Sequence, residues 1–318
     1  MTTTQEFYKK VNHYVYDPSK PLLKEEFSTI YQAIDQRNNS QVILKVIPMF
    51  NLPQHLEKTD LFIRSYFKSL QEIQGEHAVK FLESLRTPNN LYVINENYSI
   101  STLGEKLRMK HKFTRKEACE VLQQISKGFL ASNGQVHGDL KPCNVIYHEG
   151  KVKVKDFQFM QLMNQARGQM NRAETVIGPN AYDAPEIFNN EKPSQKSDVW
   201  AAGIMFYEML FGVKPWTGQS VVSLYNNIKT KPVNFPQEIE EDLMDLLRGM
   251  LEFDQEKRFS WEDIEKHQAF KAKKKESCEE ISEEIEREEM RMSGIIRGSS
   301  WSGGMMRREV AVFGALKH

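Results

Sequence analysis

The hydrophobic pattern changes character near residue 100, and this change constrains the fold more than any other feature of the sequence. Before that point, three short runs of alternating or β-branched apolar residues predict strands, at 27–34, 41–47 and 90–97. Between the last two runs, residues 57–73 carry apolar side chains at helical intervals. The first part of the chain is therefore expected to be rich in strands, with one main helix.

After residue 101 the balance reverses. Residues 115–130 place five apolar side chains on one face of a helix, and helical patterns continue to about residue 270. The exception is NVIYHEGKVKVKDF, residues 144–157, in which His-Glu-Gly predicts the turn of a hairpin. With 318 residues the chain is long enough for two lobes, each with its own core. The expected fold class is therefore α+β.

The charge balance argues against nucleic acid or membrane as a partner. The chain has 43 Lys and Arg residues and 43 Asp and Glu residues, so its surface as a whole should not attract polyanions. The cysteines lack the spacing of a zinc site or a disulfide framework. No signal peptide is evident, and no apolar run reaches the roughly 18 residues of a membrane span. We expect an intracellular, cytoplasmic protein.

Residues 271–318 differ in composition from the rest of the chain. A basic run is followed by an acidic segment with a thin apolar stripe, and then by a stretch rich in Gly, Ser and Arg. Such a segment buries too little apolar surface to offset the entropy lost on ordering. We therefore expect a charged, weakly ordered tail.

A short polar motif precedes the predicted hairpin. In VHGDLKPCNVIY, Asp139, Lys141 and Asn144 stand close together, and Asp156 follows at the far end of the hairpin. Carboxylate and amide oxygens that meet at one point suit Mg²⁺, which proteins hold with one or two carboxylates together with substrate phosphates. Lys141 would lie beside a transferred anionic group, and Lys45, in the strand that contains VILK, would supply a second cation.

Five motifs resemble those of the eukaryotic protein kinases in order and approximate spacing. They are HGDLKPCN, DFQ, APE, SDVWAAGIMFYEM and KRFSWEDI, and the resemblance covers about residues 14–270. It implies a two-lobed protein kinase-like fold, with a small β-rich N-lobe at about 14–96 and a larger helical C-lobe at about 97–270. Residues 1–13 would form an N-terminal extension.

The resemblance also implies a role for each polar residue. Asp139 matches the catalytic base that accepts the proton of the substrate hydroxyl, and Lys141 matches the lysine near the γ-phosphate in Ser/Thr-type kinases. Asn144 and Asp156 match the Mg²⁺ ligands, and Lys45 matches the lysine that grips the α- and β-phosphates of ATP. The implied cofactors are ATP and Mg²⁺, and the implied partners are protein substrates.

Two further segments would contact the nucleotide according to the same resemblance. Leu23 and Ser28 fall at glycine positions of the loop that covers the phosphates. Glu96, Asn97 and Tyr98 fall at the hinge, whose backbone would offer hydrogen bonds to adenine.

Other matched residues are expected to support the fold. Glu186 of APE and Arg258 of KRFSW should form a buried ion pair, and Asp198 should anchor the backbone of the catalytic loop. His137 could be read as a metal ligand or a base. Because no second His lies nearby in the sequence, we expect instead a hydrogen-bonded core histidine.

The sequence departs from the family pattern around the nucleotide. Leu23, Glu25 and Ser28 replace glycines that let backbone N–H groups approach phosphates, and Glu25 would face an anion, so weaker ATP binding is expected. Tyr66 falls where a helix normally supplies the Glu that orients Lys45. A lysine misplaced by about 1 Å could cost on the order of 100-fold in rate.

Two milder departures lie beside the catalytic residues. Gly138 replaces the Arg of the usual H-R-D, which removes a side chain that pairs with a phosphorylated activation loop. Gln158 replaces the Gly of D-F-G and so restricts the backbone just after a metal ligand.

Three functions are compatible with these residues. The first is a protein kinase that transfers the γ-phosphoryl group of ATP to Ser or Thr hydroxyls, and the second is a pseudokinase that acts as an ATP-binding or scaffold protein. The retained Asp139 and Asp156 favour the first. The third is a small-molecule phosphotransferase of the aminoglycoside or choline kinase type, which the APE and DVWAAG segments disfavour. The sequence does not predict the oligomeric state.

Overall fold

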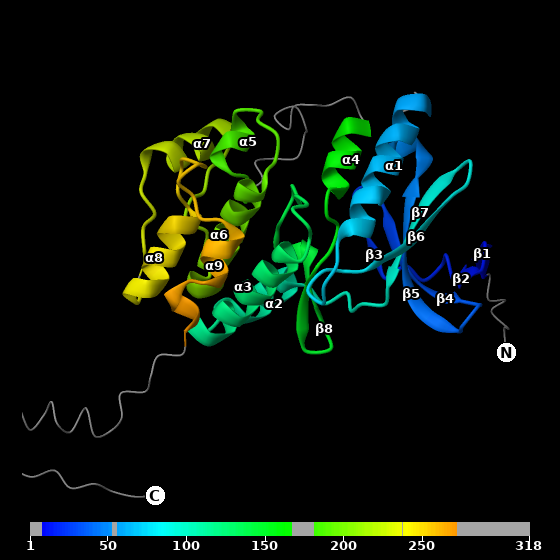
Figure 1. Ribbon diagram of the computed structural model, residues 1–318, viewed down its shortest axis with the longest axis horizontal. Helices are drawn as coiled ribbons and strands as arrows, with labels where there is room; N and C mark the ends of the chain where they lie inside the picture. The colour runs from blue at the N-terminus through cyan, green and yellow to red at the C-terminus, as the bar shows by residue number, and fades with distance from the viewer. Residues whose placement is uncertain (1–7, 53–55, 167–180, 237, 272–318) are drawn as a thin grey trace, which may run out of the picture. The chain divides into compact units, whose positions relative to one another are not determined.

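Short strands in the first part of the chain form one antiparallel sheet (Figure 1). The computed structural model describes residues 8–52, 56–166, 181–236 and 238–271. Within them, seven strands pair in the order β1-β2-β4-β5-β7-β6, and β3 shares one edge of β4 with β2. The strands are β1 (Lys9–Val11), β2 (Tyr14–Tyr16), β3 (Leu23–Lys24), β4 (Thr29–Asp35), β5 (Ser40–Pro48), β6 (Phe81–Arg86) and β7 (Asn90–Glu96).

The predicted strands at 27–34, 41–47 and 90–97 are confirmed as β4, β5 and β7. The strands β1, β2 and β3 were missed because they have only two or three residues, too few to show alternation. β6 was missed as well, because its six residues do not alternate between buried and exposed positions. β1 lies inside the segment 1–13 that we assigned to an extension, yet Lys10 pairs with Val15 of β2. The sheet therefore begins at Lys9, before the expected domain boundary.

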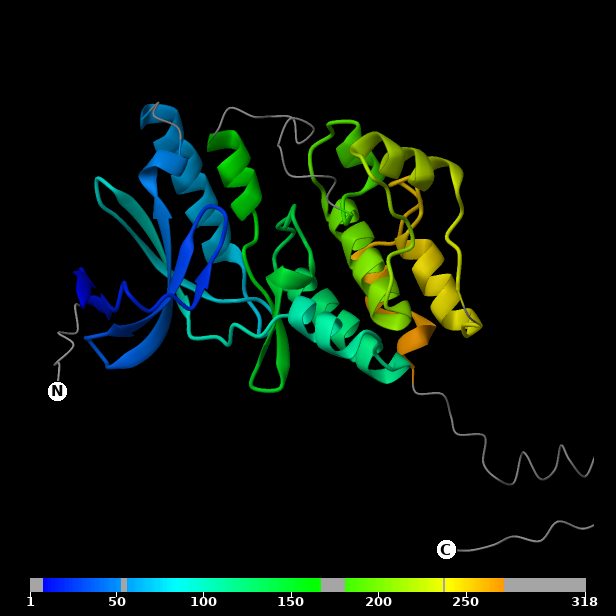
Figure 2. The same cartoon turned by 180° about the vertical axis from the view of Figure 1, so that it is seen from behind.

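Two helices lie side by side next to the sheet (Figures 1 and 2). α1 (Leu56–Glu72) is the helix predicted at 57–73, and α4 (Phe159–Ala166) begins just after the DFQ motif. Ile63 and Tyr66 of α1 share an apolar cluster with Leu162 and Met163 of α4. This packing holds the segment that follows Asp156 against the N-terminal half of the unit.

The second half is helical, as the sequence predicted. Several of its helices begin with capping boxes, in which a Ser or Thr side chain and the third helical residue satisfy each other's backbone N–H groups, for example at Thr102, Thr114 and Ser194. The remaining helices are α2 (Leu103–Lys110), α3 (Arg115–Leu130), α5 (Pro185–Phe188), α6 (Gln195–Phe211), α7 (Val221–Thr230), α8 (Glu241–Met250) and α9 (Trp261–Glu265), with 3-10 turns at Met49–Asn51, Pro142–Asn144 and Gln268–Phe270.

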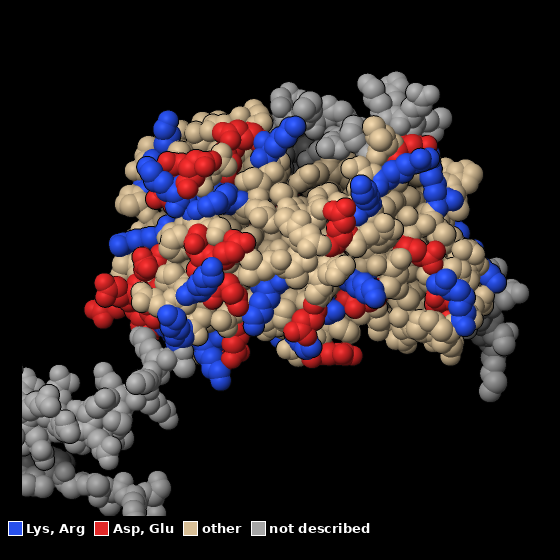
Figure 3. Space-filling model, viewed as in Figure 1, with Lys and Arg blue, Asp and Glu red and all other residues tan. Residues whose placement is uncertain are grey.

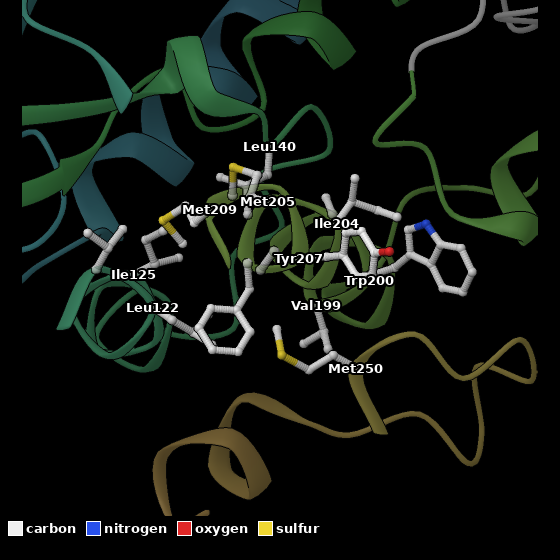
Figure 4. Packing of buried hydrophobic residues seen from close by; sticks show 14 of the residues in the cluster. Leu122, Ile125, Leu140, Val199, Trp200, Ile204, Met205, Tyr207, Met209 and Met250 are labelled. Carbon is white, nitrogen blue, oxygen red and sulfur yellow. The ribbon is translucent and has the colours of Figure 1, made fainter. Parts of the chain in front are cut away.

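Helix α6 forms the centre of the helical core. It is apolar on nearly all sides, as expected for a helix surrounded by other elements. Its side chains extend toward α3, toward Leu140 and toward Met250 of α8 (Figure 4). Leu140 belongs to the segment 137–144, which contains HGDLKPCN and which we call the catalytic loop. Asp198, in the first turn of α6, is 2% exposed and faces the same loop. The core therefore places a rigid helix directly behind the catalytic loop.

The predicted hairpin links the two halves. β8 (Val145–His148) and β9 (Lys151–Val154) pair with each other, and Glu149 and Gly150 take positive φ values of 49° and 79° at the turn. The N–H of Val79 donates to the carbonyl of Val154, with N and O 2.9 Å apart. Because β9 ends two residues before Asp156, this contact fixes where the carboxylate of Asp156 lies relative to the sheet.

Of the predicted tail, 271–318, only Lys271 belongs to the described residues. In the part of the chain that is described, each helix is too short or too polar to cross a lipid bilayer.

Candidate active site

The structure brings the predicted catalytic and metal-binding residues to one cavity. Asp139, Lys141, Asn144 and Asp156 all line a cavity of about 290 Å³. Lys141 lies beside Asp139, with Nζ and Oδ2 2.8 Å apart. The amide Nδ2 of Asn144 donates to the carbonyl oxygen of Asp139 over 2.9 Å, which turns its Oδ1 atom away from that carbonyl. A carboxylate, an ammonium group and an amide oxygen therefore share one small volume.

The catalytic loop is held from behind by buried polar groups. Asp198 accepts hydrogen bonds from the backbone N–H groups of His137, at 2.8 Å, and Gly138, at 2.9 Å, as the sequence analysis expected. His137 is fully buried, and its Nδ1 accepts from the N–H of Asp139, so its Nε2 is the atom that donates to the carbonyl of Lys155. Burial lowers the pKa of His137 to about 4. His137 is therefore a neutral core histidine that supports Asp139.

The glycine in HGD has a conformational reason. Gly138 has a φ of +77°, a region that side chains disfavour. A Cβ there would also come within 2.5 Å of the Gln161 side chain on α4. The position that usually carries Arg is thus packed against the segment that follows Asp156.

Lys45 has carboxylate partners, although Tyr66 replaces the glutamate that the helix normally supplies. Its Nζ lies 2.7 Å from Oδ1 of Asp156 and 3.1 Å from Oε2 of Glu25, and neither residue lies on α1. Tyr66 of α1 is buried instead in the cluster that contains Phe159, whose ring centroid lies 3.6 Å from Nζ of Lys45. The loop between β3 and β4, not the helix, supplies the glutamate.

A second lysine completes a ring of alternating charges. Nζ of Lys155 lies 2.6 Å from Oδ2 of Asp156 and 3.0 Å from Oε1 of Glu25. Each carboxylate therefore bridges both ammonium groups. We call Glu25, Lys45, Lys155 and Asp156 the charge ring. The lysine side chains are 1% and 5% exposed, whereas the carboxylates, at 12% for Asp156 and 22% for Glu25, reach the cavity.

The pKa shifts of Asp156, Glu25 and Lys155 all favour the charged forms of these side chains. Burial by itself would raise the pKa of Asp156, but the ammonium groups of Lys155 and Lys45 outweigh it and hold the pKa below its usual range. Glu25 follows the same pattern, because Lys45 and Lys155 lower its pKa against the effect of burial. Burial would lower the pKa of Lys155, and the two carboxylates raise it well above the ordinary value.

The loop that carries Glu25 closes on itself. The N–H of Glu25 donates to the carbonyl of Ser28, and the Ser28 hydroxyl donates to Oε2 of Glu25, both over 2.8 Å. Ser28 is 4% exposed and is not among the residues that line the cavity, whereas Leu23 is 39% exposed and does line it. The predicted nucleotide contact of Ser28 is thus replaced by a role in orienting Glu25.

At the predicted hinge, side chains fill much of the space. Glu96 pairs with Lys153, with Oε1 and Nζ 2.5 Å apart, and Asn97 accepts a hydrogen bond from Gln32. Tyr98 is 5% exposed and packs in an apolar cluster with Ile30, Ile43 and Ile146.

This cluster spans β4, β5 and β8, so the Tyr98 ring lies between the sheet and the hairpin.

The cavity of about 290 Å³ is at the small end of ligand sites, which typically have volumes of about 300 to 1,000 Å³.

The residues present fit a magnesium ion. Asp156 offers carboxylate oxygens and Asn144 an amide oxygen at the same cavity, and hard oxygen ligands of this kind suit Mg²⁺. Each carboxylate oxygen of Asp156 already accepts a hydrogen bond from a lysine ammonium group. Each oxygen has a further lone pair that is able to bind a metal ion. Asn144 and Asp156 can therefore hold one ion next to bound phosphates.

Gln158 adopts the conformation that normally calls for glycine. Its φ is +57°, which costs on the order of 1 kcal/mol for a residue with a Cβ. Its side chain accepts from the hydroxyl of Ser69 on α1 over 2.8 Å and donates to Gln135 over 2.6 Å. These bonds offset the strain and tie the catalytic loop to α1.

The ion pair expected between APE and KRFSW is present. Arg258 donates to both carboxylate oxygens of Glu186, at 2.6 and 2.9 Å, and the two side chains are 0% and 5% exposed. The guanidinium group also lies over the Trp200 ring, 5.1 Å from its centroid. The pair joins the start of α5 to the segment before α9.

Sequence reasoning missed three features of the site. They are Lys155, the pairing of Glu25 with Lys45, and the burial of the Tyr98 side chain. The sequence did contain a signal for Lys155, which directly precedes Asp156 and is the third Lys in the alternating stretch KVKVK. The other two depend on contacts between distant segments and left no signal in the pattern.

A second cavity continues from the first. It measures about 570 Å³ and shares Thr102, Arg108, Lys141 and Cys143 with the smaller one. Its far end reaches α6, where Glu208 accepts from the Tyr182 hydroxyl over 2.6 Å. The two cavities adjoin at these shared residues, and we call them together the groove.

The two lobes and the residues gathered between them define a protein with a kinase-like α+β fold. The family description "Protein kinase domain" matches residues 21–270. The chain therefore belongs to the protein kinase family.

Known relatives share about a quarter of their residues with the chain over this region. Serine/threonine-protein kinase atg1 of Dictyostelium discoideum is 28% identical over 268 residues, which is 81% of this chain and 39% of the relative. CBL-interacting protein kinase 17 of Oryza sativa is 29% identical over 65% of this chain and 46% of its own length. An Aurora kinase of Schizosaccharomyces pombe is 25% identical over 80% of this chain and 70% of its own length. The chain thus spans less than half the length of the first two.

Proposed function

We propose that this protein transfers the γ-phosphoryl group of ATP to Ser or Thr hydroxyls of protein substrates. The observation that carries the proposal is that Asp139, Lys141, Asn144 and Asp156 line one cavity, with Lys45 held against Asp156. Some relatives, among them atg1 of Dictyostelium discoideum, are named serine/threonine-protein kinases, which supports the same acceptor type.

In the proposed reaction, Asp139 acts as the base. In the transfer, a bond forms between the acceptor oxygen and the γ-phosphorus while the bond to the bridging oxygen breaks, which leaves ADP. The Asp139 carboxylate would accept the proton that the hydroxyl loses. Lys141, 2.8 Å from that carboxylate, adds positive charge beside the group that moves.

Lys45 and the hinge would position the nucleotide. Lys45 is fixed by two carboxylates and the Phe159 ring, so its ammonium group is already oriented. Mg²⁺, held by Asn144 and Asp156, would neutralise charge on the β- and γ-phosphates.

The groove beyond Lys141 is the site that suits the acceptor chain. It runs from Asp139 past Arg108 toward α6, and a peptide segment in it would bring a hydroxyl to the Asp139 carboxylate. Arg108 is exposed and lines both cavities, so acidic residues near the acceptor would be favoured.

The test is phosphate incorporation by the full chain. With Mg²⁺ and ATP, we expect labelled phosphate on Ser or Thr of the chain itself or of a generic protein, identified by mass spectrometry. Asp139→Asn should abolish the label because amide cannot accept the proton. Asp245→Asn is the matched control, since Asp245 lies exposed on α8 and pairs only with His267 among the described residues.

Two results would count against the proposal. Equal incorporation by wild type and Asp139→Asn would assign the label to a contaminant. A thermal-shift titration that shows no stabilisation at millimolar nucleotide would show that nucleotide does not bind the folded chain.

A further inference from the structure

Lys155 is a buried cation at a functional position. Acidic and basic side chains are interspersed over the surface in Figure 3, where water solvates them, but the Lys155 side chain is only 5% exposed. Taking an ammonium group out of water is costly unless it is paired and hydrogen-bonded. Lys155 meets that condition with two residues that themselves line the active-site cavity, Glu25 and Asp156.

The neighbouring lysines of the same strand region behave differently. Lys151 pairs with Glu76 at the surface, where both side chains are more than half exposed, and Lys153 pairs with Glu96. Of these three lysines, only Lys155 belongs to the charge ring. The Lys155 side chain points toward Glu25 and Asp156 because Lys155 comes directly before Asp156, after β9 has ended.

Stability alone is a poor reason for such a ring. Replacing buried ion pairs by apolar side chains of similar size is often neutral or stabilising, because the charges no longer need to be desolvated. The charge ring nevertheless retains four ionisable side chains. Because Glu25 and Asp156 face the cavity, the feature is better explained by a charged ligand.

The ring sets the charge that an entering phosphate meets. Glu25 and Asp156 each contribute one negative charge, and Lys45 and Lys155 each contribute one positive charge, so the ring is neutral. Without Lys155 it would carry a net charge of minus one. A polyphosphate would then be repelled unless a divalent ion came with it.

We propose that Lys155 is a built-in cation for the nucleotide phosphates, so that this protein binds ATP even when no divalent metal is present. The inference rests on the proposed function, since it concerns the same nucleotide site. It assigns to Lys155 a share of the charge neutralisation that the phosphates need, on the side of Asp156 opposite to Lys45.

The test is the binding of ATP to the full chain by isothermal titration calorimetry, in a buffer with Mg²⁺ and in a buffer with EDTA. We expect wild type to bind in EDTA within about tenfold of its affinity in Mg²⁺. Lys155→Met should weaken binding in EDTA by about tenfold or more, and binding in Mg²⁺ by less. Lys151→Met, which removes the same charge from the exposed start of β9, should change neither value.

The outcomes separate this inference from the proposed function. Binding of ATP by wild type in Mg²⁺ only would overturn the role of Lys155 and leave the kinase proposal standing. Equal binding in EDTA by wild type and Lys155→Met would do the same. Absence of binding in both buffers would overturn both proposals.

A second variant keeps the test decisive if Lys155→Met does not fold. Glu25→Gln removes one negative charge from the ring and leaves both lysines in place, so the ring becomes positive. Binding in EDTA should then tighten, by about tenfold. Unchanged or weaker binding by the folded Glu25→Gln protein would contradict the proposal.

Discussion

Lys45 and Glu25 form an ion pair, with Nζ and Oε2 3.1 Å apart, in which the loop between β3 and β4 supplies the carboxylate. Tyr66 stands on α1 where the family normally has the glutamate, and its side chain is buried. The orientation of Lys45 therefore depends on a loop that also covers the cavity, and it does not require a carboxylate on α1.

Glu25→Gln is expected to lower kcat by about tenfold to 100-fold, because Lys45 loses one of the two carboxylates that orient it. The KM for ATP should not rise, since a negative charge near the phosphates is removed as well. Steady-state kinetics with a generic protein substrate would measure both. Glu76→Gln, at a surface pair, is the control. An unchanged kcat for Glu25→Gln would show that Asp156 alone is sufficient.

Tyr98→Ala is expected to tighten nucleotide binding while it destabilises the protein. The ring fills space among Ile30, Ile43 and Ile146 beside the hinge, and its removal should make room for a purine. Truncation of a buried aromatic side chain typically costs about 3 to 5 kcal/mol. Thermal unfolding would show a lower Tm without ligand and a larger shift with ATP. Tyr98→Phe, which keeps the ring, should show neither change, and an equal ATP shift in wild type and Tyr98→Ala would refute the steric explanation.

Loss of one partner of the Glu186–Arg258 pair should destabilise the fold strongly. Both side chains are buried, so Glu186→Gln leaves the guanidinium group without its counter-ion, at a cost of about 3 to 5 kcal/mol. Urea unfolding monitored by tryptophan fluorescence would measure this change. Lys110→Met, which breaks an exposed pair with Glu117, should cost less than about 1 kcal/mol. Similar losses of unfolding free energy in both variants would mean that burial of the Glu186–Arg258 pair does not increase its contribution to stability.

Stability should fall as the pH is lowered, because of His137. Burial depresses its pKa from 6.5 to about 4, so the unfolded chain takes up a proton in this interval before the folded chain does. The contribution is complete above about pH 6.5 and is lost as the pH falls toward 4. Between pH 7 and pH 5 the expected loss is about 2 kcal/mol.

His137→Gln serves as the comparison for this pH dependence, because an amide does not titrate. The free energy of unfolding, measured by urea titration at each pH, should decline less steeply in the variant than in wild type. Parallel declines would assign the effect to other groups.

The catalytic loop was predictable because its geometry is local. Asp139, Lys141 and Asn144 lie within six residues, and the loop is closed by bonds within itself, from the N–H of Asn144 to the carbonyl of Lys141 and from its side chain to Asp139. A motif of this kind specifies its own shape. The strands at β4, β5 and β7 and helices α1 and α3 were predictable for a similar reason, since their periodicity is long enough to read.

The charge ring was not predictable because its members are far apart in the chain. Lys45 is 111 positions from Asp156, and Glu25 is 130 positions from Lys155. The sequence indicated that Glu25 would face phosphate and that the helix would not supply Lys45 with its usual glutamate. In the folded chain these two side chains form an ion pair, so Glu25 has a cation beside it and Lys45 has a carboxylate partner.

The sequence by itself determined the family, the longer elements and the polar motif whose side chains meet at the cavity, because each of these is written in short motifs or in local periodicity. Only the tertiary structure decided which carboxylate holds Lys45, where Lys155 points and how far Tyr98 fills the space beside the hinge. Pairing of buried charges depends on distances of about 3 Å between separate segments, and no local pattern can encode such distances.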